Sequence, residues 1–179
     1  MHRIHIRRAR PEDEAAIAEL HAQSWRFAYR DALSADYLDH RVVEDRRKVW
    51  KERFAAPLES RCVFIAELEG QVAGFASALA NANDAWGTLI DNVHVLPQFH
   101  RRGVGERLLS AVLEWLRQVA PDKGLYLWVL QSNRSALAFY DRLAGEIVES
   151  DFWDAPGGGR IPEYRVAWKS IDALRRVKG

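Results

Sequence analysis

The sequence has one cysteine and one methionine, and it lacks any long apolar run. The lone cysteine, Cys62, cannot form a disulfide within the chain, so the fold must depend on a packed core. Because it lies in the apolar run of residues 62–66, we expect a buried structural thiol and not a nucleophile. Since no apolar run approaches the roughly 20 residues of a membrane span, and the N-terminus lacks a signal-peptide core, we expect a soluble, cytoplasmic protein without membrane partners.

The sequence also lacks an excess of charge of either sign. It contains 26 basic and 25 acidic residues, for a net charge of +1. Nucleic-acid-binding domains usually carry a basic surplus, so nucleic acid is not an expected partner, and a polyanionic substrate is not indicated. A length of 179 residues with 48% apolar and 28% charged residues is typical of one globular domain, here residues 1–179.

Hydrophobic periodicity predicts an alternation of strands and helices. Helices are expected over residues 11–28, 34–54, 103–119 and 134–143, and strands over residues 3–8, 61–68, 71–80, 88–95, 125–130, 145–153 and 162–169. Residues 125–130 are apolar on both faces, which is typical of a central strand covered on both sides. Gly157, Gly158 and Gly159 predict a mobile hairpin loop. The order indicates an α/β (α+β) fold with a mixed, mostly antiparallel sheet of about seven strands, helices on both faces and one parallel crossover.

One segment carries a chemical signal, at residues 93–109. A strand ends at Pro97, two arginines and two glycines follow, and a helix begins with no Ser, Thr, Asp or Asn at its obvious cap position. The first amides of a helix lack internal partners and favour negative charge, so this end predicts a phosphate site with Arg101 and Arg102 adding charge. A tight turn without a ligand is the alternative, because a lone Gly-x-Gly between a strand and a helix is often no more than a turn. A Walker loop and a dinucleotide fingerprint do not fit, because Gly105 is followed by Glu106-Arg107 and Leu108 stands where a third glycine belongs.

The segment His100-Arg101-Arg102-Gly103-Val104-Gly105 resembles motif A of the GNAT N-acetyltransferase superfamily. A second match, Asn133 to Leu143, is similar to the Asn-x-x-Ala-x-x-Phe-Tyr run of that family, and the order of elements agrees from residue 3 to 169. His100 departs from the usual Gln or Arg, and Leu143-Ala144-Gly145 departs from the usual Leu-Gly-Phe. The resemblance implies the acyl-CoA N-acyltransferase fold, with acetyl-CoA as co-substrate and no metal.

The resemblance also implies roles for individual residues. Tyr140 would protonate the leaving thiolate of CoA. From the residues alone, Asn133 can also be explained as a helix N-cap, and Tyr140 can also be explained as a core residue. The cofactor-binding residues implied are Val93, Val95, His100, Arg101, Arg102, Gly103, Val104, Gly105, Glu106, Asn133 and Phe139.

The general base is left open by the sequence. Asp91 and His94 are candidates on the strand before motif A, but they have opposite parity, so only one should face the site in a regular strand. Glu163, on the last strand, is a third candidate.

Aromatic residues indicate where the acceptor binds. Trp25 and Tyr29 lie one helical turn apart and, with Phe152 and Trp153 beside the glycine loop, would line a pocket that is apolar with polar tips. Core packing is the alternative for Trp25.

We therefore expect an N-acetyltransferase that moves the acetyl group of acetyl-CoA directly to a primary amine of a small molecule in a ternary complex. The alternatives are a protein N-terminal or lysine acetyltransferase and a non-catalytic acyl-CoA-binding regulatory domain. The amine, a homodimer and the use of longer acyl groups are left open.

Overall fold

A seven-stranded sheet forms the centre of the computed structural model, which describes residues 3–174. The strands follow the order β1-β2-β3-β4-β5-β7-β6. They are β1 (His5–Arg8), β2 (Arg61–Leu68), β3 (Gln71–Asn83), β4 (Gly87–Val95), β5 (Leu125–Leu130), β6 (Glu146–Asp154) and β7 (Arg160–Trp168). The α-helices are α1 (Glu14–Ala28), α2 (Val42–Ala55), α3 (Val104–Val119) and α4 (Arg134–Arg142). All pairs are antiparallel except β4 with β5, so the predicted fold class is confirmed.

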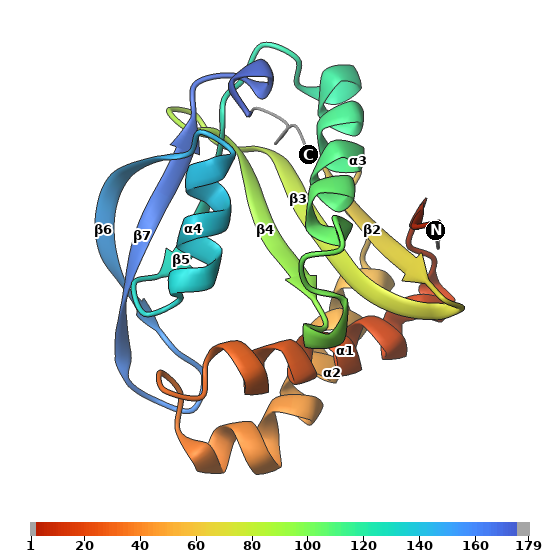
Figure 1. Cartoon of the computed structure of the whole chain (residues 1–179), viewed down its shortest axis with the longest axis vertical. Helices are drawn as coiled ribbons and strands as arrows, with labels where there is room; N and C mark the ends of the chain where they lie inside the picture. Colours follow the sequence, from red (N-terminus) through yellow and green to blue (C-terminus); the bar gives the residue numbers. More distant parts are fainter. Residues whose placement is uncertain (1–2, 175–179) are drawn as a thin grey trace.

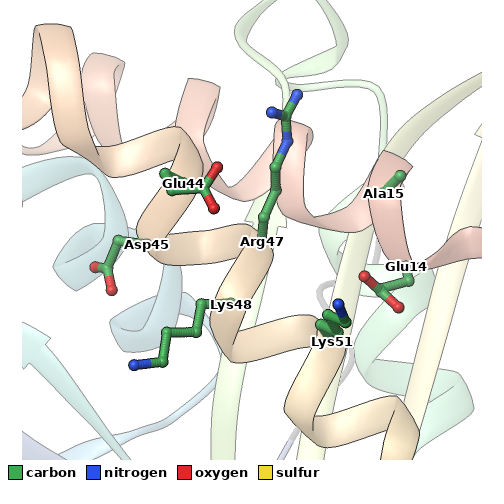
Figure 2. A pocket seen from close by; sticks show the side chains of 7 residues that line it. All are labelled: Glu14, Ala15, Glu44, Asp45, Arg47, Lys48 and Lys51. Carbon is green, nitrogen blue, oxygen red and sulfur yellow. The ribbon is translucent and has the colours of Figure 1, made fainter.

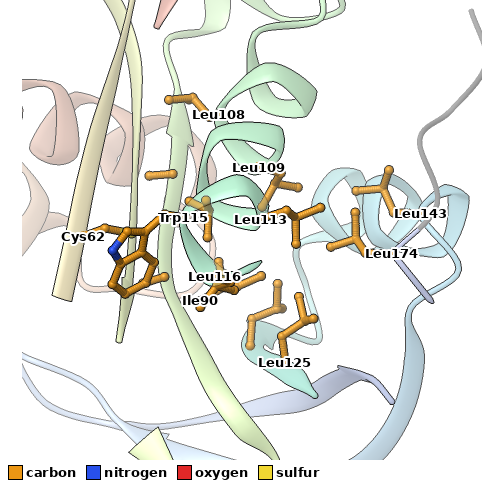
Figure 3. Close-up of a cluster of buried hydrophobic side chains, with 14 of the residues drawn as sticks. Cys62, Ile90, Leu108, Leu109, Leu113, Trp115, Leu116, Leu125, Leu143 and Leu174 are labelled. Carbon is orange, nitrogen blue, oxygen red and sulfur yellow. The ribbon is translucent and has the colours of Figure 1, made fainter. Parts of the chain in front are cut away.

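The helices cover both faces of the sheet. In Figure 1, α3 crosses in front of the strands, and α1 and α2 lie together at the bottom of the view. Four leucines of α3 belong to the buried cluster drawn in Figure 3: Leu108, Leu109, Leu113 and Leu116. Cys62 lies fully buried in this cluster, and burial raises the pKa of its thiol to about 12, which confirms a structural thiol. On the other face, Trp50 of α2 is fully buried with Ile17 and Phe75.

Two predicted elements differ clearly from those observed, while the ends of several others shift by one to three residues. The helix expected over residues 34–54 is divided, because a π-helical turn, Tyr37–Arg41, precedes α2. Ser34 lies just before this π-helical turn, and its Oγ accepts a hydrogen bond from the Tyr37 amide at 3.3 Å. The strand expected to end at residue 80 continues to Asn83. The central strand β5 is buried on both faces, as its apolar sequence predicted.

Strands β4 and β5 form a fork. Their parallel ladder contains only Thr88 with Leu125 and Leu89 with Tyr126, although both strands continue beyond it. Along the rest of its length, β5 pairs with β7, from Leu125 with Trp168 to Leu130 with Glu163. Beyond the second pair, β4 therefore presents backbone groups that β5 does not engage.

The closed end of the fork depends on two glycines. The Thr88 amide donates a hydrogen bond to the Gly124 carbonyl at 3.0 Å. Gly87 has a φ of +80°, and a Cβ there would lie 2.3 Å from the Gly124 oxygen. Only glycine allows the two backbones to approach this closely.

Gly87→Ala should therefore lower the free energy of unfolding in urea by about 2–4 kcal/mol, since left-handed strain and overpacking add. Gly70→Ala is the matched control, because Gly70 has a φ of +76° and open space around its Cβ. The control should cost only about 1–2 kcal/mol. Equal losses in the two variants would show that the fork does not depend on this contact.

No helix within residues 3–174 is long and apolar enough to cross a membrane.

Candidate active site

Helix α3 begins beside the open end of the fork. Gly103 is its N-cap, with a left-handed φ of +80° and no side-chain hydrogen bond to the first turn. The first-turn amides are therefore free of a side-chain cap, as the sequence predicted. Such a helix end is an anion-binding site, because the exposed amides and the helix dipole both favour negative charge.

The loop before α3 is held by its side chains. His100 donates from Nε2 to the Val95 carbonyl at 2.8 Å, which fastens the loop to the end of β4. The Arg102 guanidinium forms an ion pair with Glu69 in the turn between β2 and β3. Arg101 is exposed and has a φ of +59°. His100 therefore supports the loop, and the Arg102 side chain is already engaged elsewhere.

Three elements converge at Gly105. A Cβ on this residue would lie 3.4 Å from Cζ of Phe139 in α4 and 3.9 Å from Cγ2 of Val95 in β4. The missing side chain lets β4 and α4 approach the first turn of α3 closely. The sequence-predicted cofactor residues of these three elements thus lie around one end of the fork.

Helix α4 contributes Asn133 and Tyr140. Asn133 caps the helix, since its Oδ1 accepts from the Ala136 amide at 3.1 Å. Tyr140 is 8% exposed and packs edge-on to Trp168. Burial raises the pKa of the Tyr140 hydroxyl, and Tyr29 of α1 raises it further. The hydroxyl therefore stays protonated at neutral pH, and Tyr29 lies close enough to influence its pKa.

A cavity of about 620 Å³ opens on the α1 and α2 side of the fork. Its wall residues include His21, Trp25 and Tyr29 of α1, Arg46, Val49 and Arg53 of α2, Asp91 and His94 of β4, Trp128 of β5, and Trp153, Asp154 and Glu163 of the β6–β7 hairpin. A second hollow of about 490 Å³ lies between α1 and α2 (Figure 2). Charged side chains of both signs line it and none of the predicted site residues does, so it is not the candidate site.

The aromatic wall predicted from the sequence is present in part. Trp25 and Tyr29 lie 5.5 and 6.3 Å from the Trp153 ring, and all three line the cavity. Trp25 is only 6% exposed, so it belongs to a core cluster and to the wall at once. Phe152 does not join them, because neighbouring strand residues face opposite ways; it is 52% exposed and stacks on Arg160.

The parity argument for the base candidates fails because β4 has a bulge at Asp91. Ser77 of β3 pairs with Asn92 and the next residue, Ala78, pairs with Ile90, which leaves Asp91 as the extra residue. Both Asp91 and His94 therefore line the cavity.

The three base candidates differ in their surroundings. Asp91 forms ion pairs with Arg53 at 2.8 Å and Arg61 at 3.1 Å. Burial, assisted by Arg46, lowers the pKa of His94 to about 3. Burial and the nearby Asp151 raise the pKa of Glu163 to about 7.

Arg46, Arg53 and His21 also line the cavity, and sequence reasoning missed them. Arg46 and Arg53 are seven residues apart, which places them on one face of α2. His21 precedes Trp25 by one turn on α1. Helical spacing relative to Trp25 was the signal that could have found His21. No group of three or more possible metal ligands occurs in the part of the chain that the structure describes.

Comparison with known proteins agrees with this geometry. The family model described as "Acetyltransferase (GNAT) family" matches residues 15–145. The chain is 29% identical over 177 residues to "Uncharacterized N-acetyltransferase YuaI" of Bacillus subtilis (strain 168), which covers 97% of this chain and 98% of that protein.

Solved structures share the fold. PaiA N-acetyltransferase from Thermoplasma acidophilum, in complex with coenzyme A, superposes with a TM-score of 0.70 and 19% identity, covering 90% of this chain and 98% of that one. YncA from Salmonella typhimurium, with its cofactor acetyl-CoA, gives 0.66 and 18%, covering 95% of each. The chain belongs to the GNAT family of N-acetyltransferases and is an acetyl-CoA-dependent acyltransferase.

Proposed function

We propose that this protein transfers the acetyl group of acetyl-CoA directly to the primary amine of a small molecule, with both substrates bound at once. The observation that carries the proposal is the fork, which joins the uncapped start of α3 to the 620 Å³ cavity. Holding two reactants at one opening supplies much of the rate of such a transfer.

On the cofactor side, the loop and first turn of α3 fit a pyrophosphate. The backbone of Val93 and Val95 lies beyond the last β4–β5 pair and is assigned to the pantetheine arm, together with the Asn133 side chain and the Phe139 ring. His100 positions the loop through Val95. The pyrophosphate is assigned to the backbone of Arg101, Arg102, Gly103, Val104, Gly105 and Glu106.

On the acceptor side, the hairpin supports a small molecule over a peptide. A Cβ on Gly157 would lie 2.7 Å from the Tyr37 side chain, so the tip of the β6–β7 hairpin packs against the segment before α2. This contact holds the hairpin in the position where Asp154, Ala155 and Pro156 line the cavity. A wall fixed in this way limits the space for the acceptor, which suits a small ligand better than an extended chain.

Glu163 is the general base in this proposal. A base works best when its pKa lies near the operating pH, which Glu163 meets at about 7. His94, with a pKa of about 3, is too weak a base, and Asp91 is held by two arginines. Glu163 replaces both as the proton acceptor, directly or through one water.

The reaction then needs three linked events. Glu163 removes a proton from the acceptor ammonium, and the nitrogen lone pair forms a bond to the carbonyl carbon of the thioester. As the C–S bond of the thioester breaks, Tyr140 donates its hydroxyl proton to the leaving sulfur. The second proton of the acceptor nitrogen leaves as the amide forms and returns through water to the Tyr140 oxygen. The raised pKa of Tyr140 keeps this proton available throughout neutral pH.

Gly105→Glu tests the cofactor site. The new carboxylate would lie at the phosphate-binding amides, each of which is worth roughly tenfold to hundredfold in affinity. We expect calorimetry to detect no CoA binding, while the circular dichroism spectrum is unchanged. Val119→Glu, at the exposed end of the same helix, is the matched control and should bind CoA normally. Normal CoA affinity in Gly105→Glu would remove the phosphate site from this helix.

Tyr140→Phe tests the acid. The substitution removes one hydroxyl and keeps the ring packing, so turnover should fall roughly 10²–10⁴-fold with acetyl-CoA affinity little changed. Steady-state rates and CoA calorimetry measure the two effects. Turnover close to wild type would return Tyr140 to a purely structural role.

Glu163→Gln and Asp151→Asn test the base through the pH profile. Because the base must be deprotonated, kcat/KM should rise with pH through about 7 in the wild type. Glu163→Gln should abolish this limb and lower kcat roughly 10²–10⁴-fold. Asp151 raises the pKa of Glu163, so Asp151→Asn should move the limb to lower pH. An unmoved limb in Asp151→Asn would assign it to the acceptor amine instead.

A further inference from the structure

Two different elements bring opposite charges to the cavity wall. Arg46 and Arg53 come from α2, which we call the arginine end, and Glu163 and Asp154 come from the β6–β7 hairpin, which we call the hairpin end. The amine must approach Glu163 for the reaction proposed above, so the arginine end faces another part of the acceptor.

Arg46 is a buried guanidinium that the protein satisfies only in part. Its side chain is 11% exposed and its Cζ lies 4.2 Å from the centre of the Trp25 ring. One NH2 nitrogen donates to Asp45 at 2.9 Å, and that carboxylate also accepts from the Tyr37 hydroxyl. Among the described residues, Nε of Arg46 has no hydrogen-bond partner. Stacking on Trp25 fixes the plane of the guanidinium and leaves its donors at the edge.

The charges around Arg46 do not cancel. Three guanidinium groups, of Arg46, Arg53 and Arg61, share two carboxylates, of Asp45 and Asp91. Burial lowers the pKa of Arg53; Asp91 opposes this shift, and both Arg61 and Arg46 add to it. The mutual effect of the arginines indicates a positive potential at this end of the cavity.

The neighbouring histidines add donors and no negative charge. Burial lowers the pKa of His21 well below its usual value, and His94 and Arg46 lower it further, so the ring is neutral. The Trp50 indole donates to Nδ1 of His21 at 3.0 Å, which places the ring proton on Nε2. Within residues 3–174 this Nε2 also has no partner. The arginine end thus holds a surplus of N–H donors over acceptors.

We propose that Arg46 binds an anionic group of the acceptor, a carboxylate or similar oxyanion, so that the substrate is an amino acid or another amine that carries an acid. This assignment rests on the proposed function. The fork of a guanidinium matches two oxygens of a carboxylate, and a charge held at one end directs the amine toward Glu163 at the other. Arg53 is held by Asp91 and contributes to binding of the anionic group through its positive charge.

The test compares each amino acid with its decarboxylated amine. The twenty standard amino acids are screened for acetyl-CoA turnover, and kcat/KM is measured for each substrate found and for its matching amine. The wild type should prefer the acid by roughly tenfold to hundredfold, the value of a charge-assisted contact. Arg46→Gln should remove this preference by raising the KM of the acid while the KM values of the amine and of acetyl-CoA stay unchanged. Arg46→Lys should keep part of it, since lysine retains charge without the fork.

Arg47→Gln is the matched control. Arg47 follows Arg46 in α2, is 57% exposed and lies 3.9 Å from Glu19 outside the cavity. The Arg47→Gln variant should keep the preference for the acid over its decarboxylated amine. Equal kcat/KM for acids and decarboxylated amines in the wild type, or an equal loss for both in Arg46→Gln, would overturn the proposal.

Calorimetry with amino acids and CoA separates this proposal from the proposed function. Binding that Arg46→Gln abolishes, without acetyl transfer, would support the anion site and contradict the transfer reaction. Absence of binding by all twenty amino acids, whatever the turnover of other amines, would contradict the anion site alone.

Discussion

The short parallel pairing of β4 with β5 is the constraint on which the rest of the site depends. Two residue pairs join the strands, and the backbones of Gly87 and Gly124 hold them at one end. Because β7 takes over as the partner of β5, the sheet continues without closing the fork. The start of α3 lies beside the free part of β4, fastened by His100, and the cavity opens on the α1 and α2 side. The proposed cofactor site and the proposed acceptor cavity therefore meet at this opening.

The bulge in β4 shapes the acceptor side of this opening. The bulge turns Asp91 toward α2, where its carboxylate pairs with Arg53 and ties the helix to the strand, and the same carboxylate pairs with Arg61 of β2. Because Asp91 is engaged in these ion pairs, the reaction proposed above takes its base from elsewhere on the wall. Glu163 lies on β7, the strand that continues the sheet beyond β5, and the same burial that shapes the cavity raises its pKa. Asp91 and the proposed base Glu163 thus lie on two different strands, β4 and β7.

The sequence predicted what depends on local signals. Element order, the uncapped start of α3, the doubly covered strand at residues 125–130 and the aromatic wall of Trp25 and Tyr29 all follow from spacing and residue type. Three features could not be predicted because they depend on partners distant in the chain. The bulge at Asp91 appears only in the register with β3, and the pairing of β6 with β7 decides which of Phe152 and Trp153 faces the cavity. From the sequence, Arg46 is an ordinary charged residue of α2, because its contact with the Trp25 ring exists only in the folded structure.

Burial decides which groups set the charge of the cavity. His21 and His94 stack at 4.5 Å between their ring centres, and burial beside Arg46 keeps both neutral. The arginine end therefore holds its positive charge across the physiological range. Glu163, with a pKa of about 7, is the wall group whose charge changes there. As pH rises through 7, the hairpin end becomes more negative while the charge of the arginine end is constant, so the dipole of the cavity grows. In the proposed reaction, a zwitterionic acceptor would gain orientation from that dipole in the same pH range in which Glu163 can remove its proton.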